Sequence, residues 1–269
     1  MKVEKRLLND GFEHEDMRKV VNLLSSSWNV ADLTRMMYAS KFINMIGKDT
    51  VNVLDIGCSS GRLLQVQQTM VRSPGTKKIK YVGVDMRESS LKKVLNFAKE
   101  NLSKEAAERV SIETSNITEQ SECKYLLKKY GKFDVIALFE VFEHLPNGSQ
   151  KNVLKYIDKL LDENGVLLLS TPVHYVEEEM FWPNDHEKEF MFKELKQMLS
   201  EQFEITNICG NHVDSNKLKQ TLNGRDKEIY NQLLKVSKNG VWLNEIFGSV
   251  YKECCKGCIF VCKKKRKVN

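Results

Sequence analysis

Three side chains that can move protons or bind a metal ion stand close together near the middle of this 269-residue chain. They are Glu140, Glu143 and His144, and their spacing of i, i+3 and i+4 predicts that they share one face of a helical turn. His144 could act as a general base, because an imidazole titrates near neutral pH. The three residues could instead bind Mg²⁺ or Mn²⁺ together with His186, in a mixed carboxylate–imidazole site. His144 could also be structural, bonded to backbone at the start of a helix.

A glycine-containing loop after a predicted strand indicates a nucleotide-binding site upstream of these residues. The apolar stretch 53–56 includes Asp55 and breaks into a loop that carries Gly57 and Gly61, after which a helix is expected. Glycines allow a tight turn and the close approach of a ligand, whose negative groups then face the helix N-terminus. A second predicted strand ends in Asp85, where folds of this kind hold ribose hydroxyls.

The loop Asp55-Ile56-Gly57-Cys58-Ser59-Ser60-Gly61 resembles motif I of the class I S-adenosylmethionine-dependent methyltransferases, commonly D-x-G-x-G-x-G. Ser59 stands where the middle glycine is usual. The resemblance covers about residues 50–200 and is to the type 11/12 methyltransferase domains. Further segments follow in the family's order: a strand at 110–113, Asn116-Ile117, a strand at 133–139, E-x-x-E-H-L at 140–145 and a strand at 166–172.

The resemblance implies an α/β fold: a Rossmann-like, seven-stranded, mostly parallel sheet with helices on both faces and an antiparallel last strand. The closing pair of strands is expected at 203–208 and 258–262. A helix is expected over 153–161, with Gly165 as its C-cap.

The expected domain organisation has three parts. Residues 1–48 form an N-terminal helical cap, residues 49–262 form the methyltransferase domain, and residues 263–269 form a basic tail. Within the domain, 213–250 is expected to be a helical insertion near the mouth of the active site, because it is too long for a hairpin turn. The cap helices are expected at 17–24 and 31–46.

The cofactor that the resemblance implies is S-adenosylmethionine. Asp85 would accept bonds from the ribose hydroxyls, Gly57 and Gly61 would frame the methionine end, and Met86 and Ile117 would cover the two faces of the adenine. The full expected set of cofactor-binding residues is Asp55, Gly57, Cys58, Gly61, Asp85, Met86, Asn116, Ile117 and Phe139.

The implied reaction is methyl transfer to an oxygen or nitrogen of a small or medium polar substrate, with His144 and Glu143 as the catalytic residues. The E-x-x-E-H-L segment also occurs in the ubiquinone-pathway O-methyltransferases. A weaker resemblance is to the small-RNA 3′-end 2′-O-methyltransferases, in which two Glu and two His bind a metal ion. Here the matching residues are Glu140, Glu143, His144 and, more loosely, His186.

We favour the metal-free reaction on a small substrate over metal-dependent RNA methylation. A catalytically silent cofactor-binding subunit of a partner enzyme is a second alternative.

Composition excludes several other classes of protein. The chain has 41% hydrophobic residues and no apolar run long enough to cross a membrane, so a cytoplasmic protein is expected. The basic run 263–268 carries most of the net charge of +6 and resembles a nuclear localisation signal. The seven cysteines are expected to be reduced thiols, and a zinc site is disfavoured because two candidate ligands, Cys258 and Cys262, would be too far apart on one strand.

Overall fold

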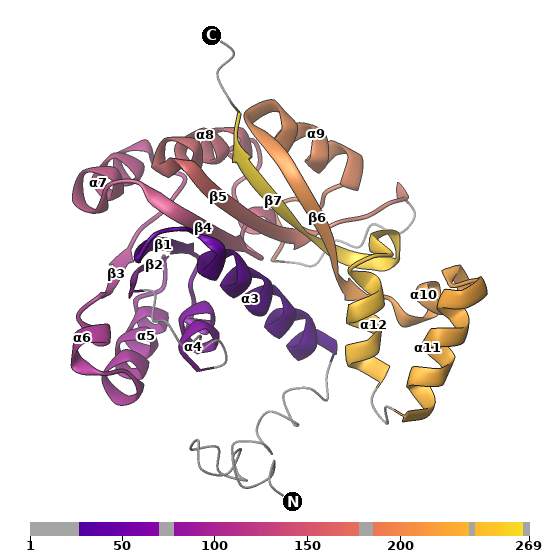
Figure 1. The fold of residues 1–269 in the computed structure, drawn as a ribbon. Coiled ribbons are helices and arrows are strands. Elements are labelled where there is room, and N and C mark those ends of the chain that lie inside the picture. Colours follow the sequence, from indigo (N-terminus) through magenta and orange to yellow (C-terminus); the bar gives the residue numbers. More distant parts are fainter. Residues whose placement is uncertain (1–26, 70–77, 178–184, 237–239, 266–269) are drawn as a thin grey trace, which may run out of the picture. The chain divides into compact units, whose positions relative to one another are not determined.

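The computed structural model describes residues 27–69, 78–177, 185–236 and 240–265 (Figure 1). The helix expected at 17–24 and the last residues of the basic run, 266–269, lie outside the described residues. The chain divides into two compact units, 35–209 with 256–269 and 1–34 with 210–255.

The described elements alternate between strands and helices over most of the chain. The strands are β1 (Thr50–Ile56), β2 (Lys78–Asp85), β3 (Val110–Thr114), β4 (Phe133–Phe139), β5 (Leu161–Pro172), β6 (Phe203–Val213) and β7 (Cys255–Lys264). The helices are α3 (Ser27–Met45), α4 (Arg62–Thr69), α5 (Glu88–Asn101), α6 (Lys104–Ala107), α7 (Gln120–Tyr130), α8 (Gln150–Leu160), α9 (Phe192–Gln202), α10 (Ser215–Thr221), α11 (Gly224–Val236) and α12 (Gly240–Gly248). Two short 3₁₀ helices are η1 (Phe142–His144) and η3 (Lys252–Cys254).

The seven strands form one sheet in the order β3-β2-β1-β4-β5-β7-β6. The pairs β1–β2, β2–β3, β1–β4 and β4–β5 are parallel, and β7 runs antiparallel to β5. This topology confirms the predicted fold class. The strand order reverses between β1 and β4, so the carboxyl ends of these two strands open the crevice in which such sheets bind ligands.

Burial explains why the apolar runs became central strands. All seven residues of β4 are buried, as expected for a strand covered on both faces. Figure 1 shows α4 and α5 on one side of the sheet and α7, α8 and α9 on the other. The core under α7, α8 and α9 includes Leu126, Leu154 and Leu199, each fully buried against the sheet. No helix in the described ranges combines the length and hydropathy that crossing a membrane requires.

The predicted C-cap at Gly165 is wrong. Helix α8 ends at Leu160, and Gly165 lies inside β5. A Cβ atom on Gly165 would stand 2.9 Å from the carbonyl oxygen of Phe133 on the neighbouring strand. The glycine is therefore required by close packing of two strands and not by a helix end.

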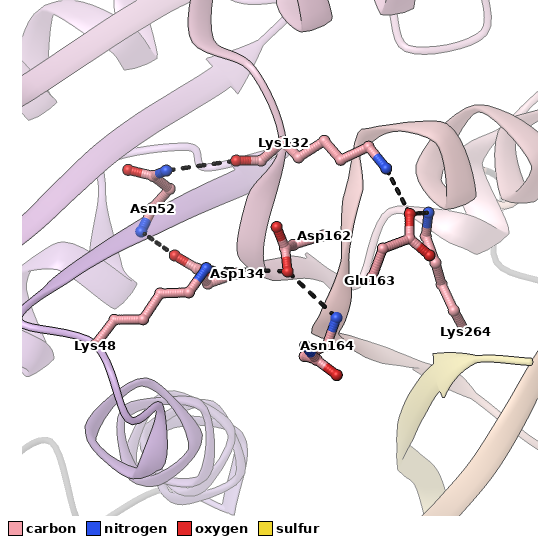
Figure 2. Close-up of polar contacts among 8 residues, drawn as sticks. All are labelled: Lys48, Asn52, Lys132, Asp134, Asp162, Glu163, Asn164 and Lys264. Carbon is pink, nitrogen blue, oxygen red and sulfur yellow. Dashed lines mark hydrogen bonds and ion pairs between the residues drawn. The ribbon is translucent and has the colours of Figure 1, made fainter. Parts of the chain in front are cut away.

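The amino ends of β1, β4 and β5 are joined by a polar cluster (Figure 2). The buried carboxylate of Asp134 accepts a hydrogen bond from the backbone N–H of Asn52 at 2.8 Å and pairs with Lys48. A groove of about 430 Å³ lies beside it, with Phe42 and Val166 in its lining. This cluster lies at the amino ends of the strands, whereas the loop with Gly57 lies at their carboxyl ends. The cluster is therefore not part of the crevice at the carboxyl ends.

The unit formed by 1–34 and 210–255 has its own small core, made by Leu218, Leu222, Tyr230 and Leu243 with their neighbours. Buried Glu245 accepts hydrogen bonds from the backbone N–H groups of residues 212 and 213, at 3.1 and 3.0 Å. The helices α10, α11 and α12 fall within the segment expected to be a helical insertion. The position of the segment 213–250 relative to the active site stays a prediction.

Candidate active site

The loop after β1 is held against β2 by its own backbone. The amides of Gly57 and Cys58 both donate to the carbonyl of Val84, at 2.8 and 3.0 Å. Gly57 and Gly61 have φ values of +71° and +76°, which glycine adopts without strain. The tight turn inferred from the sequence is therefore present, and its glycines are needed for the path of the backbone.

Two residues other than glycine have a strained backbone at the carboxyl ends of β1 and β4. Ser59 has a φ of +46° in the loop after β1, and Glu140 has a φ of +52° directly after β4. Such conformations are uncommon for residues with a side chain and gather at functional sites. Both stand at the carboxyl ends of the adjacent strands where the order reverses, so strain coincides with the expected ligand crevice.

Asp85 organises this crevice from the end of β2. Its carboxylate is buried and accepts hydrogen bonds from the backbone N–H groups of Ser59 and Arg87, each at 2.9 Å. Nε of Arg87 also lies 3.5 Å from one of its oxygens. A carboxylate has about four acceptor positions, so capacity is left for a hydroxyl donor. Met86, beside it, is 68% exposed. The assignment of Asp85 to the ribose and Met86 to the adenine stays a prediction.

A second buried acid, Asp55, lies beneath the loop. Its carboxylate accepts a hydrogen bond of 2.6 Å from the hydroxyl of Tyr81 on β2, and burial followed by the charge of Asp55 raises the pKa of Tyr81. Cys58 is buried, and burial raises the pKa of its thiol, so the thiol is kept neutral. A Cβ atom on Gly83 would lie 2.9 Å from the Cys58 sulfur. Cys58 thus fills the space that Gly83 leaves, as a small apolar side chain would.

The other expected cofactor residues lie at neighbouring strand ends. Asn116 follows β3, and its side-chain oxygen accepts hydrogen bonds from the backbone and hydroxyl of Thr118. Ile117 is buried next to it, and Phe139 is buried at the end of β4. Their contacts with the adenine stay predictions.

The structure brings Glu143, His144 and His186 together. One potential ligand atom from each lies within 4.8 Å of the others. The two imidazole rings meet edge to face, with centroids 4.8 Å apart. His186, which is distant in the sequence, therefore joins the pair that the sequence placed side by side.

Glu140 is not part of this group. Its carboxylate accepts a hydrogen bond of 2.7 Å from the hydroxyl of Ser170 and lies 3.4 Å from the guanidinium of Arg35. The expected single helical turn from 140 to 144 is absent, because Glu140 is in the left-handed region and only Phe142–His144 form η1. The backbone therefore turns Glu140 toward β5 and α3.

Glu143 is the most deeply buried member of the cluster, with a side chain only 2% exposed. Its carboxylate accepts a hydrogen bond of 2.8 Å from the hydroxyl of Thr171. Burial, and next the charge of Glu140, raise the pKa of Glu143 to about 8. A bound cation would oppose this effect, because a nearby positive charge favours the ionised carboxylate.

Hydrogen bonds orient the two imidazoles. His144 Nδ1 lies 2.7 Å from the carbonyl oxygen of Asp185, and a carbonyl can only accept, so Nδ1 carries the proton. His186 Nδ1 contacts the carboxylate of Glu189. Both rings can therefore present an unprotonated Nε2, and that of His144 lies 3.9 Å from Glu143. Metal-binding imidazoles commonly show this arrangement, with an acceptor on the second nitrogen.

Several residues of the site were missed by sequence reasoning. Thr171 and Ser170, at the end of β5, hold the two glutamates, while Arg35 and His174 come from distant segments. No spacing in the sequence links any of them to the E-x-x-E-H-L segment. Glu189 had one signal, its position three residues after His186. All seven cysteines lie in the described residues, and no disulfide bond joins them.

Comparison with known proteins agrees with the fold. A family model described as a methyltransferase domain matches residues 47–236, and the chain belongs to that family. Together with the sheet topology, this places the chain in the class I S-adenosylmethionine-dependent methyltransferase family.

One relative is the ubiquinone biosynthesis O-methyltransferase of Coxiella burnetii, 26% identical over 175 residues, which are 61% of this chain and 64% of the relative. The matches span between 39% and 64% of the length of the first three curated relatives. Among solved structures, an O-methyltransferase of a Brevibacillus brevis polyketide synthase in complex with S-adenosylhomocysteine has a TM-score of 0.52. It is 20% identical, and the match covers 85% of this chain and 71% of that one.

The N-methyltransferase NodS of Bradyrhizobium japonicum, also in complex with S-adenosylhomocysteine, has a TM-score of 0.52 at 14% identity, with 87% of each chain covered. Both structural similarities concern the fold. Because one neighbour methylates oxygen and the other nitrogen, the fold leaves the acceptor open.

Proposed function

We propose that this protein is an O-methyltransferase that holds the hydroxyl of a small polar substrate at Glu143, His144 and His186, with a divalent cation bound by these three residues. The observation that carries the proposal is the convergence of the three side chains within 4.8 Å. The sequence favoured a metal-free reaction because the E-x-x-E-H-L segment also occurs in metal-free relatives and because His186 matched only loosely. The position of His186 beside Glu143 now leads us to prefer the metal centre.

The donor set fits a divalent cation. One carboxylate and two imidazole nitrogens suit Mn²⁺ or a similar transition metal better than an all-oxygen site would. Both imidazoles have an acceptor on Nδ1, and Glu143 is held by Thr171. Three protein ligands leave positions open for a substrate, as in catalytic metal sites. When bound, the cation would orient the acceptor hydroxyl and lower its pKa.

The chain's own residues have separate tasks in this reaction. S-adenosylmethionine supplies a methyl group that is already activated on its sulfonium sulfur. The loop after β1 and Asp85 would hold the cofactor, so that the acceptor oxygen could attack the methyl carbon in line with the S–C bond, with S-adenosylhomocysteine as the leaving group. The new O–C bond forms as that bond breaks, and the hydroxyl proton passes to a base. With a cation on Nε2 and the proton on Nδ1, His144 has no lone pair for that proton, so the proton would pass to a water molecule at the site; His144 is the base only when no cation is bound.

The printed names of the curated relatives support a small acceptor, since several are ubiquinone biosynthesis O-methyltransferases. We favour an acceptor with two neighbouring oxygens, because such a pair can occupy two open positions on one cation. A terminal ribose of RNA also carries neighbouring hydroxyls, and His186 in the cluster favours this second candidate.

A methyl-transfer assay on chelator-treated protein tests the proposal. Labelled S-adenosylmethionine is offered with a catechol-type diol, with a short RNA, and with the same RNA after periodate oxidation of its 3′ diol. We expect label in the catechol after Mn²⁺ is added and little without it. The variant Glu187→Gln is a matched control, because Glu187 is exposed beside His186.

Each other result has a defined meaning. Label in intact but not oxidised RNA would make the ribose the acceptor. Full activity without any cation would overturn the metal centre and return His144 to a simple general base. Methylation of amines alone would overturn the assignment to oxygen.

A further inference from the structure

Glu189 is a buried carboxylate that lies between two imidazoles. One of its oxygens lies 2.6 Å from Nε2 of His174, and the other contacts Nδ1 of His186. The side chain of Glu189 is 2% exposed, and those of His174 and His186 are 13% and 14% exposed. A buried charge is stable only when it is well hydrogen-bonded, and two imidazole N–H donors satisfy this need.

The backbone around Glu189 is fixed on both sides. The amide of His174 donates to the carbonyl of Phe190 at 2.9 Å, and the amide of Phe192 donates to the carbonyl of His174 at 2.8 Å. The ring of Phe190 stacks on Phe142 of η1, with centroids 5.3 Å apart. Glu189 is therefore held in place between the end of β5 and the helix that carries Glu143 and His144.

The same segment is also bonded to the cluster itself. The carbonyl of Glu143 accepts the amides of Glu187 and Lys188, at 2.9 and 3.1 Å. The position of His186 is thus set by backbone bonds, and the orientation of its ring is left to Glu189.

We propose that His174, Glu189 and His186 form a relay in which Glu189 is a positioning residue for the metal centre. An ionised carboxylate can only accept hydrogen bonds, so Glu189 requires the proton of His186 on Nδ1, and Nε2 then carries no proton and can act as a metal ligand. His174 donates to the second oxygen and prevents the carboxylate from turning away. This inference rests on the proposed function, because it assigns a tautomer to one of the three proposed ligands.

Two variants separate this role from a purely structural ion pair. Glu189→Leu removes both acceptors, whereas Glu189→Gln keeps one acceptor and can serve only one imidazole at a time. Glu187→Leu changes the same residue type two positions away at an exposed site and is the control. Urea unfolding and circular dichroism show which variants are folded.

Cobalt binding, followed by the visible absorption of Co²⁺, measures the effect on the centre without any turnover. We expect affinity to fall about 10- to 100-fold in Glu189→Leu, the range found when an acceptor behind a metal-bound imidazole is lost. Glu189→Gln should be intermediate, and Glu187→Leu should bind as the wild type does.

Long-range ¹H–¹⁵N NMR of the metal-free protein reports the tautomer of each histidine directly. We expect His186 to carry its proton on Nδ1 in the wild type and to populate the other tautomer in Glu189→Leu. A wild-type His186 protonated on Nε2 would overturn the relay even if the variant fails to fold. Equal Co²⁺ affinity in the folded variant would overturn it as well. If Co²⁺ and Mn²⁺ do not bind the wild type, the metal centre of the proposed function fails, and the tautomers still decide the relay.

Discussion

Gly57 and Val141 approach each other so closely that a Cβ atom on Gly57 would lie 2.2 Å from Cγ2 of Val141. Gly57 belongs to the loop after β1, and Val141 directly follows the strained Glu140 after β4. The loop after β1 and the E-x-x-E-H-L segment are therefore packed against each other at a glycine.

Gly57→Ala should destabilise the protein by about 2–4 kcal/mol, because the clash with Val141 adds to the strain of a positive φ. Affinity for S-adenosylhomocysteine should fall with it. Gly131→Ala is the matched control: its φ is +75°, but nothing lies within 4 Å of its Cβ position. Urea unfolding would show the difference. Equal losses in the two variants would mean that Val141 yields freely, and Gly57→Ala/Val141→Ala should recover only the part due to the clash.

Asp85→Ala should weaken binding of S-adenosylhomocysteine at least tenfold, as measured by calorimetry. Each lost charge-assisted hydrogen bond is worth about 1.5–3 kcal/mol before water compensates, and the Ser59 amide also loses its acceptor. Asp162→Ala, at the amino edge of the sheet, serves as the control. A folded Asp85→Ala protein with wild-type affinity would refute the ribose assignment.

Substitutions of Glu140 and of Glu143 should differ sharply in their effect on the affinity for a metal ion. Glu143→Gln should abolish Mn²⁺ binding, followed by the electron paramagnetic resonance signal of free Mn²⁺, because it removes a ligand of the cluster. Glu140→Gln should change the affinity by less than about fivefold, since its side chain bonds to Ser170 and its charge acts only at a distance. A comparable loss in both variants would show that Glu140 is a fourth ligand, as the RNA-methyltransferase resemblance implies.

Glu143 should make the stability of the metal-free protein depend on pH. Its pKa is raised from 4.5 to about 8 in the folded state, mainly by burial, so the fold favours the neutral carboxyl. The neutral Glu143 carboxyl stabilises the folded state fully below pH 4.5. This stabilisation is lost as the pH rises toward 8, at up to about 1.4 kcal/mol per pH unit. Between pH 5 and 8, the midpoint temperature of thermal unfolding should therefore change less in Glu143→Gln than in the wild type. Parallel pH profiles would contradict the raised pKa.

The strands and the glycine turn that build the expected cofactor site could be predicted because they are encoded locally. Apolar runs at strand length, the glycines at 57 and 61, and the acid at 85 occur in the order in which a parallel sheet uses them. Each feature depends on the backbone preference or burial of a few neighbouring residues. The seven strands and the antiparallel last strand were implied by the family resemblance that these residues carry, and the sheet topology confirms them.

The acceptor half was decided by contacts between distant segments. The spacing of Glu140, Glu143 and His144 predicted a shared helical face, but the positive φ of Glu140 turns it to Ser170. Gly165 shows the same limit, because a glycine needed for contact with a neighbouring strand looks in the sequence like a helix cap.

The sequence by itself determined the family, the sheet and the glycine turn after β1, because these depend on local patterns. Only the tertiary structure decided that His186 meets Glu143 and that Glu189 lies behind it. The bond from His144 to the carbonyl of Asp185 joins residues 41 positions apart. Such a contact depends on how the segment after β5 packs on η1. The spacing of residues within either segment does not predict it.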